Sequence, residues 1–324
     1  MLSMTNATER PASVPMVILA FATVYLVWGS TYFFIQLSVA HIPPMLVGAF
    51  RYLLSGLLML AYCLLTRKPV FSWPVIKPAA VSGFLLLCCG NGGLIWAEQY
   101  IPSGLAAILL ASGPVWFVVL DRRQWAVNFS SASTIVGLIV GFGGVLLLFG
   151  DRLRGGTSAG PAAAGGVPLA GAHSREMAAL AVLVCASISW AAGSLYSKYR
   201  SAPVSNAVNT GWQMMAAGLI FLPLSLISGE WAHFQPGTVP WSSWWGILYL
   251  VTMGSLVGYS AFVWLLSVRP ATQVSTHAYV NPVVAVLLGA FFNGERMSGL
   301  QLAGLVVILG SVLLINLVKY RTGK

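Results

Sequence analysis

Charged side chains are scarce in this chain of 324 residues. They make up 7% of it, whereas a soluble domain carries about a quarter. Hydrophobic residues account for 58%, and the mean hydropathy is +0.83. This composition leaves too little polar surface for a water-soluble globule, so it excludes a soluble enzyme and a nucleic-acid-binding protein. The net charge of +10 needs another explanation, and a lipid bilayer supplies one.

Residues that commonly carry metal or acid–base chemistry are also few. The four cysteines fall in apolar runs without a metal-ligand spacing, as small buried hydrophobes do: Cys63, Cys88, Cys89 and Cys185. The four histidines are scattered, and none lies near an aspartate: His41, His173, His233 and His277. A membrane-embedded transferase would need His/Asp or paired-carboxylate clusters. We therefore expect no enzyme, no catalytic residue, no metal and no cofactor.

Apolar residues gather in ten runs, each near the length of about 20 residues that a membrane-spanning helix needs. The runs cover residues 14–38, 43–66, 78–98, 102–120, 130–150, 177–197, 205–228, 243–267, 270–291 and 298–318. The sequence thus predicts an all-α membrane protein of ten transmembrane helices. Its expected parts are a tail (1–13), a first five-helix repeat (14–150), a flexible Gly/Ala/Pro-rich linker (151–176), a second repeat (177–318) and a tail (319–324).

Lysine and arginine residues predict how the chain lies in the membrane. If the N-terminus is cytoplasmic, 12 of them fall in cytoplasmic segments and 4 in external ones. Basic residues favour the cytoplasmic side. We therefore expect a multi-pass protein of the inner (plasma) membrane with both termini in the cytoplasm and the 151–176 linker outside.

Matching residues recur at nearly constant offsets in the two halves. The pairs are Pro102 with Pro270, Pro114 with Pro282, Gly90 with Gly258 and Trp96 with Trp264 at 168; Gly137 with Gly304 and Gly143 with Gly310 at 167; and Trp28 with Trp190 and Gly56 with Gly218 at 162. Because each half has an odd number of predicted spans, the halves would point in opposite directions. Such inverted repeats are typical of secondary transporters.

Several short stretches carry a family resemblance. They are Trp28-Gly29-Ser30-Thr31-Tyr32, Gly90-Asn91-Gly92 with Ala97-Glu98, Pro102-Ser103-Gly104-Leu105-Ala106-Ala107, Ser189-Trp190-Ala191 and residues 278–289 (AYVNPVVAVLLG). They resemble the EamA-type drug/metabolite transporters, and 278–289 resembles the YedA-like branch of bacterial inner-membrane exporters. The resemblance covers nearly the whole chain apart from the N-terminal tail and the linker. It implies two inverted five-helix repeats around a central substrate cavity, and it does not identify the substrate.

Two charged residues inside or beside the predicted spans are candidates for coupling or for an ion pair. Arg51 lies about 12 Å into the second span, where a charge is costly without a partner. It is either a hydrogen-bonded anchor or a binder of a substrate carboxylate. Glu98 lies near the outer end of the third span and is either a headgroup-level side chain, the partner of Arg51, or a proton carrier. The repeat places the neutral Gln213 opposite Arg51.

Polar and aromatic residues from both halves are predicted near the membrane midplane, where repeats of this kind bind solutes. These cavity candidates are Trp28, Tyr32, Asn91, Ser112, Trp190, Tyr259, His277, Tyr279 and Asn281. His277 and Asn281 also have a structural interpretation, as a hydrogen bond between helices and as a cap beside Pro282. Aromatic faces with neutral hydrogen-bonding groups suit an amino acid or a planar drug-like solute.

The predicted function is export of small organic metabolites by alternating access, with a proton gradient as a candidate driving force. An uncoupled facilitator or channel is the alternative, but it would need a continuous polar pore, and few polar residues face inward. The expected partners are a small solute and the lipid bilayer, without nucleic acid. Span five is rich in glycine, which suits close packing within a monomer or between two copies.

Overall fold

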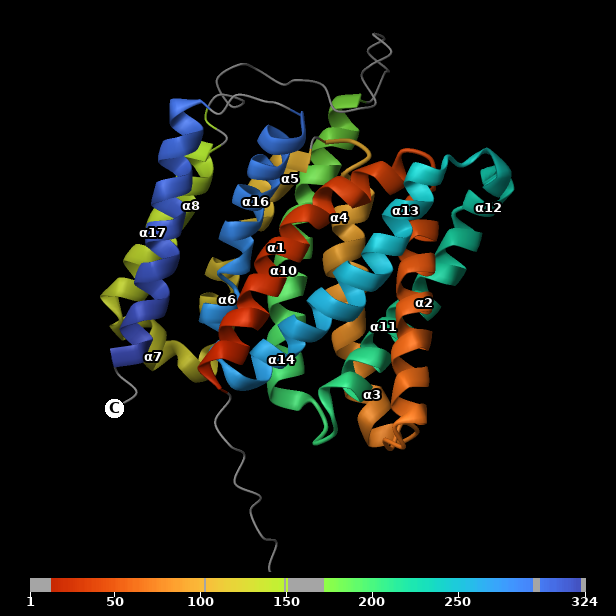
Figure 1. Cartoon of the computed structure of the whole chain (residues 1–324), viewed down its shortest axis with the longest axis horizontal. Coiled ribbons are helices and arrows are strands. Elements are labelled where there is room, and N and C mark those ends of the chain that lie inside the picture. Colours follow the sequence, from red (N-terminus) through yellow and green to blue (C-terminus); the bar gives the residue numbers. More distant parts are fainter. Residues whose placement is uncertain (1–12, 102, 149, 151–171, 294–297, 322–324) are drawn as a thin grey trace, which may run out of the picture.

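The computed structural model describes residues 13–101, 103–148, 150, 172–293 and 298–321, which are helical and contain no strand. Figure 1 shows the helices crossing the molecule between two faces. Most of the predicted 151–176 linker, residues 1–12 of the first predicted tail and residues 322–324 of the second lie outside the described residues. In the part of the chain that the structure describes, six helices are long and apolar enough to cross a membrane, so the chain is a multi-pass membrane protein.

The first half begins with two long helices and continues with broken ones. Its elements are α1 (Val14–Val39), α2 (Pro44–Leu65), α3 (Trp73–Gly83), the π-helix η1 (Phe84–Asn91), α4 (Gly92–Ala97), α5 (Ser103–Leu110), α6 (Gly113–Leu120), the 3-10 turn η2 (Arg122–Gln124), α7 (Trp125–Ser130) and α8 (Ala132–Leu148). The helix pair of Arg122–Ser130 and Ala132–Leu148 is bent by 91°.

The second half has a parallel order of elements. They are α10 (Ala172–Arg200), α11 (Asn206–Ile227), α12 (Glu230–His233), the 3-10 turn η4 (Pro236–Thr238), α13 (Trp241–Tyr249), the π-helix η5 (Leu250–Tyr259), α14 (Ser260–Val268), α15 (Ala271–Val274), α16 (His277–Asn293) and α17 (Gly299–Arg321). α10 begins in the predicted linker, five residues before the predicted span at 177.

Among the described residues, six of the ten predicted spans are helices long and apolar enough to cross a membrane. Of the other four, two are interrupted (α5 with α6, and α15 with α16), one lies in the bent pair of α7 and α8, and the last is the single helix α17. The six are Val14–Val39, Pro44–Leu65, Trp73–Ala97, Ser174–Arg200, Asn206–Ile227 and Trp241–Val268. The break between α5 and α6 adjoins Pro114, whereas the break between α15 and α16 lies between Pro270 and Pro282, and the bend between α7 and α8 has no proline beside it. Pro114 lies in the first turn of α6, where its missing N–H is not needed, and Pro282 lies inside α16.

The two π-helical segments occupy matching places in the chain. η1 ends at Asn91 and η5 ends at Tyr259, and these residues are 168 positions apart, the offset that also pairs Gly90 with Gly258. A π-helical segment widens the backbone and rotates the side chains that follow it, and such segments are frequent at functional sites. Both terminal residues lie in the cavity described below.

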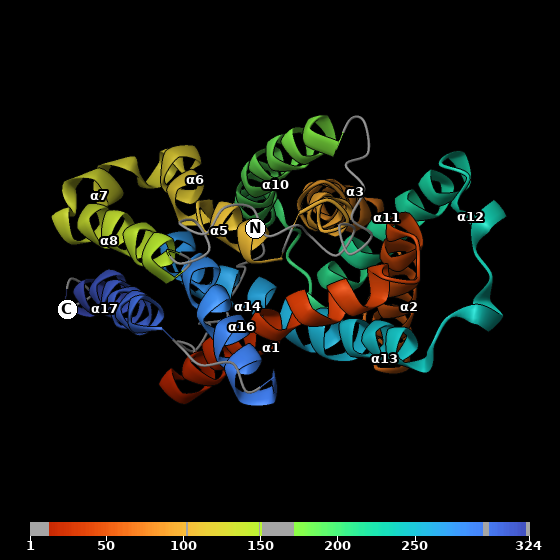
Figure 2. The same ribbon diagram turned by 90° about the horizontal axis from the view of Figure 1, so that it is seen from above.

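Glycines let the helices of the two halves approach closely. α2 packs along α11 and α8 packs along α17, and Figures 1 and 2 show α8 and α17 together at one end of the molecule. A Cβ added to Gly218 would lie 2.5 Å from the Leu53 nitrogen, and one added to Gly56 would lie 2.7 Å from the Met215 nitrogen. Such contacts leave no room for a side chain, so helix packing explains these glycines.

The ends of the helices place the halves on the same two faces (Figure 1). α1 begins and α17 ends at the lower face, whereas α8 ends and α10 begins at the upper face. α1 therefore rises through the molecule where α10 descends. The last turn of α10, with Lys198 and Arg200, reaches the lower face together with the start of α1.

Candidate functional site

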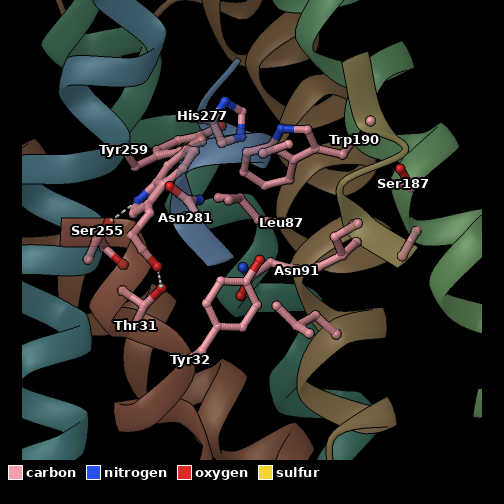
Figure 3. A pocket seen from close by; sticks show the side chains of 18 of the residues that line it. Thr31, Tyr32, Leu87, Asn91, Ser187, Trp190, Ser255, Tyr259, His277 and Asn281 are labelled. Atoms are coloured by element: carbon pink, nitrogen blue, oxygen red, sulfur yellow. Dashed lines mark hydrogen bonds between the residues drawn. The ribbon is translucent and has the colours of Figure 1, made fainter. Parts of the chain in front are cut away.

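A central cavity of about 80 Å³ lies between the two halves. Figure 3 shows its walls, which come from α1, α2, η1, α4, α5, α6, α10, η5 and α16. A water molecule needs roughly 10–15 Å³ measured in this way, so the cavity has room for several waters or for a small organic molecule. It is the kind of apolar pocket with a few converging polar groups that binds small ligands.

Aromatic rings form one wall of the cavity. The centroid of the Trp28 ring lies 5.4 Å from that of Trp190 and 5.1 Å from that of His277, both in edge-on geometry. Phe262 packs behind them, 4.9 Å from Trp28 and 5.3 Å from His277. Aromatic pairs at these distances stabilise one another, so this wall is a preformed apolar surface.

His277 is fixed by the start of its own helix. Its Nδ1 lies 2.9 Å from the Val274 carbonyl oxygen, and because a carbonyl only accepts, Nδ1 is the donor. In a neutral imidazole with this bond, Nε2 is an acceptor. The bond joins the last residue of α15 to the first residue of α16, so the two helices that it links are neighbours in the chain.

The opposite wall is polar and centres on Arg51. Its Nε donates to Ser255 Oγ at 2.9 Å, and its Nη1 donates to Asn91 Oδ1 at 3.1 Å. Tyr52 also donates to Asn91 Oδ1, at 2.7 Å. Arg51 is 4% exposed. The end of η1 and the middle of η5 thus hold the guanidinium at the cavity by neutral oxygens from both halves.

Two buried polar atoms in the cavity residues have no hydrogen-bond partner in the described part of the chain. They are the indole Nε1 of Trp190 and the side-chain Oδ1 of Asn281. An unsatisfied buried donor or acceptor costs about 1–3 kcal/mol, and native proteins contain few of them. One donor and one acceptor left open in the same cavity (Figure 3) are what a polar ligand would satisfy.

Seven of the nine predicted cavity residues line this cavity, together with Arg51. The seven are Trp28, Tyr32, Asn91, Trp190, Tyr259, His277 and Asn281. Sequence reasoning missed Thr31, Tyr52, Ser187 and Ser255, which also line it. Two of these could have been found, since Thr31 neighbours Tyr32 and Tyr52 neighbours Arg51 in the chain.

The structure places the other two predicted residues outside the cavity lining. Tyr279 is fully buried, and its hydroxyl donates to the Leu138 carbonyl oxygen of α8 at 3.0 Å. Successive helix residues are about 100° apart, so Tyr279 faces away from the cavity when His277 and Asn281 face it. Ser112 lies between α5 and α6, where its hydroxyl donates to the Leu109 carbonyl oxygen at 2.6 Å.

Arg51 and Glu98 do not form the ion pair that their depth had made possible. Arg51 uses Asn91 and Ser255 instead. Glu98 follows the end of α4, is 2% exposed, and has both carboxyl oxygens buried without a hydrogen-bond partner in the described residues. A shared depth along two helices says nothing about the directions of the side chains, and here η1 brings Asn91 to the guanidinium.

Gln213, the counterpart of Arg51 in the second half, is completely buried and fully bonded. Its Nε2 donates to Ser82 Oγ at 2.8 Å and to Ser197 Oγ at 2.9 Å, and its Oε1 accepts from the Tyr259 hydroxyl at 2.9 Å. The backbone beside it is equally tight, because a Cβ on Gly83 would lie 2.3 Å from the Gln213 carbonyl oxygen. Gln213 is a structural link between helices, outside the cavity lining.

Comparison with known proteins identifies the family. The model of the EamA-like transporter family matches residues 15–150 and 177–317. The chain belongs to the EamA-like transporter family. It is 35% identical over 307 residues to the uncharacterized inner membrane transporter YedA of Escherichia coli K12, which covers 93% of this chain and 90% of YedA.

More distant relatives agree with this assignment. The uncharacterized transporter YvbV of Bacillus subtilis is 26% identical and covers 95% of this chain and 93% of its own. Protein PecM of Dickeya dadantii is 26% identical over 90% of this chain and 89% of its own. A solved crystal structure, described only as that of a protein, matches with a TM-score of 0.69 at 19% identity and covers 96% of this chain and 100% of that one. That likeness supports the fold.

Proposed function

We propose that this EamA-like chain is a secondary transporter that exports small organic solutes across the inner membrane by alternating access. The observation that carries the proposal is the central cavity, which is built from both halves and holds the unsatisfied Trp190 Nε1 and Asn281 Oδ1. An uncoupled facilitator would instead need a continuous polar path. The packed rings of Trp28, Trp190 and His277 form an apolar wall of the cavity in place of such a path, which favours a carrier.

The architecture that we propose is ten passes arranged as two inverted repeats. Matching π-helical segments, matching prolines and the opposite directions of α1 and α10 support it. Both termini are assigned to the cytoplasm, because α1 begins, α17 ends and the basic end of α10 lies at the same face (Figure 1). The upper face is then external.

A test of the transport role uses variants within the cavity and a matched one outside it. Cells overproducing the protein should release particular metabolites into the medium. Trp190→Phe and Asn281→Ala should reduce that release, because each removes an open polar atom from the cavity. Tyr279→Phe changes a buried hydroxyl on the same helix as Asn281 but outside the cavity, and should release normally at equal protein yield. Equal release by all three variants would contradict a role for this cavity in transport.

Glu98 is our candidate for coupling export to a proton gradient. An ionised carboxylate that is buried without a partner is costly, so the protonated acid is favoured in this conformation. A conformation that opens Glu98 to water would release the proton, which is the cycle that coupling requires.

The coupling role is tested in vesicles that contain the purified protein. Glu98→Gln should abolish uphill accumulation driven by a proton gradient and leave exchange of the same solute intact. Glu176→Gln, on the outer part of α10, is the matched control and should behave like the unmodified protein. Normal uphill transport by Glu98→Gln would remove Glu98 from the coupling mechanism, and flux that never saturates would favour the uncoupled alternative.

A further inference from the structure

The guanidinium of Arg51 is a buried charge whose partners are neutral. Its two hydrogen bonds go to the Ser255 hydroxyl and the Asn91 amide oxygen, and it lies 5.0 Å from the centroid of the Tyr52 ring. No carboxylate pairs with it among the residues that the structure describes. Because a guanidinium has five N–H donors, two bonds leave most of its capacity open. Neutral oxygens orient the group without cancelling its charge.

Asn91 cannot accept a further hydrogen bond from the guanidinium through its side-chain oxygen. Asn91 Oδ1 already accepts from both Arg51 and Tyr52, which uses its two lone pairs. Arg51 is the charged side chain among the described residues that line the cavity, since the lining contains no aspartate or glutamate. Glu98 is not among the residues that line the cavity. The cavity is therefore a positively charged site in a region of low dielectric constant, where an anion is bound strongly.

The other cavity groups restrict the shape of the anion. The Trp190 indole offers a free donor and Asn281 Oδ1 a free acceptor, while Trp28 and His277 present ring surfaces. Figure 3 shows Trp190, His277, Asn281 and Asn91 around the same space. A ligand that satisfies all of these has one anionic group, an apolar or aromatic body and a polar group beside it. The volume of about 80 Å³ excludes a large polyanion in this conformation.

We propose that the transported solutes are small organic monocarboxylates with an apolar or aromatic body, amino acids included, whose carboxylate is bound by Arg51. This inference rests on the proposed function, because it names the substrate class of the same cavity. A planar carboxylate accepts two parallel N–H bonds from a guanidinium, and this geometry distinguishes arginine from lysine. The carboxylate of the solute would supply the negative charge for Arg51 that no described residue of the cavity lining provides.

The ligand side of the proposal is tested with the unmodified full chain in lipid nanodiscs. Isothermal titration calorimetry compares three probes that share one aromatic body: 3-phenylpropionate, its neutral amide 3-phenylpropionamide and the cation 3-phenylpropylammonium. We expect the carboxylate to bind about ten- to hundredfold more tightly than the amide, and the ammonium to bind most weakly. Equal binding of acid and amide, preference for the ammonium, or no binding of the acid would overturn the proposal.

The protein side uses the same chemical change at two arginines. Arg51→Lys keeps the positive charge but removes the two parallel N–H donors of the guanidinium. The preference for acid over amide should therefore fall about tenfold. Arg67→Lys, beyond the end of α2 and outside the cavity, should leave it unchanged. An unaltered preference in Arg51→Lys would overturn the assignment to Arg51. If Arg51→Lys folds poorly, the comparison of probes on the unmodified protein still decides.

The metabolites released by overproducing cells separate the two proposals. Cavity-dependent release of carboxylates supports both. Cavity-dependent release of only neutral or cationic compounds overturns the carboxylate inference and leaves the transporter role standing. Absence of any release that depends on Trp190 and Asn281 contradicts the proposed function itself.

Discussion

Arg51 and Gln213 lie 162 residues apart, the offset that also pairs Trp28 with Trp190, and their surroundings differ. Gln213 makes three neutral hydrogen bonds, is fully buried and lies outside the cavity lining. Arg51 makes two neutral bonds and presents the rest of its guanidinium to the cavity. One related position stabilises the packing of helices, and the other places a charge where a solute would bind. The two halves therefore do not contribute equally to the site.

The largest effects should come from exchanging the character of these two positions. Arg51→Gln places glutamine, the residue found at position 213, at position 51. We expect a ten- to hundredfold loss of affinity for 3-phenylpropionate, because a charged hydrogen bond is lost. Gln213→Leu should instead lower the free energy of unfolding by about 1–3 kcal/mol, since it leaves three polar partners unpaired. It should keep the preference for acid over amide. Calorimetry and thermal denaturation of each variant in detergent measure the two effects.

The opposite pattern would break this comparison. If Gln213→Leu abolished the preference for the carboxylate while Arg51→Gln affected only stability, the second half would supply the charge-sensing group. Equal effects of both variants on affinity would show that the two positions act together. The protein yield of each variant must be reported with its affinity, because both side chains hold helices from different halves.

A smaller effect is expected at the paired glycines of α8 and α17. A Cβ on Gly304 would lie 2.5 Å from the Leu148 nitrogen, and one on Gly137 would lie 2.5 Å from Ile315 Cγ1. Their companions Gly143 and Gly310 have nothing within 4 Å. Gly304→Ala should therefore destabilise the protein, because a backbone must move. Gly143→Ala and Gly310→Ala should stabilise it by up to about 1 kcal/mol through helix propensity.

Thermal denaturation in detergent and in lipid nanodiscs checks this contrast. Stabilisation by alanine at both Gly143 and Gly310 would support the correspondence between α8 and α17. In each helix one glycine would then be needed for close packing and the other would not. Destabilisation by Gly143→Ala in lipid but not in detergent would show that a second copy covers that face, which bears on the choice between monomer and homodimer. Tolerance of Gly304→Ala would contradict the close contact itself.

Sequence reasoning predicted the helical membrane fold because apolar length and proline spacing are local properties. It estimated the position of each residue along its span from the helix rise. For Trp28, Asn91 and Asn281 this estimate was enough to predict residues that line the cavity. It failed for Tyr279, because depth does not give direction around the helix axis. For the same reason it offered an ion pair between Arg51 and Glu98, which the structure does not contain.

The missing information was the backbone itself. The π-helical segment η1 changes the rotation of Asn91, and this brings an amide to the guanidinium. No feature of the residues 84–91 distinguishes a π-helix from an α-helix in a simple periodic count. Contacts between the halves, such as Arg51 with Ser255, depend in turn on how whole helices pack, which local patterns do not encode.

The smallest expected effect concerns how the matching helices α2 and α11 begin. The first amides of α2, those of Met45 and Leu46, donate to the Glu230 carboxylate at 3.1 and 2.9 Å, whereas α11 uses its own Ser205 hydroxyl, which accepts from the Val208 amide at 3.4 Å. Glu230 lies outside the apolar spans. Partial burial raises its pKa above the ordinary value of 4.5, and the two amide bonds oppose that rise.

This difference predicts that only one of the two caps depends on pH. A carboxyl whose pKa is higher in the folded state binds more protons when folded, so the free energy of unfolding should fall as pH rises through that interval and level off above it. Glu230→Gln should remove this slope. Ser205→Ala should lower stability by about 1 kcal/mol at every pH and keep the slope. Melting temperatures in detergent from below pH 4.5 to neutrality measure both, and an unchanged slope in Glu230→Gln would show that another group titrates.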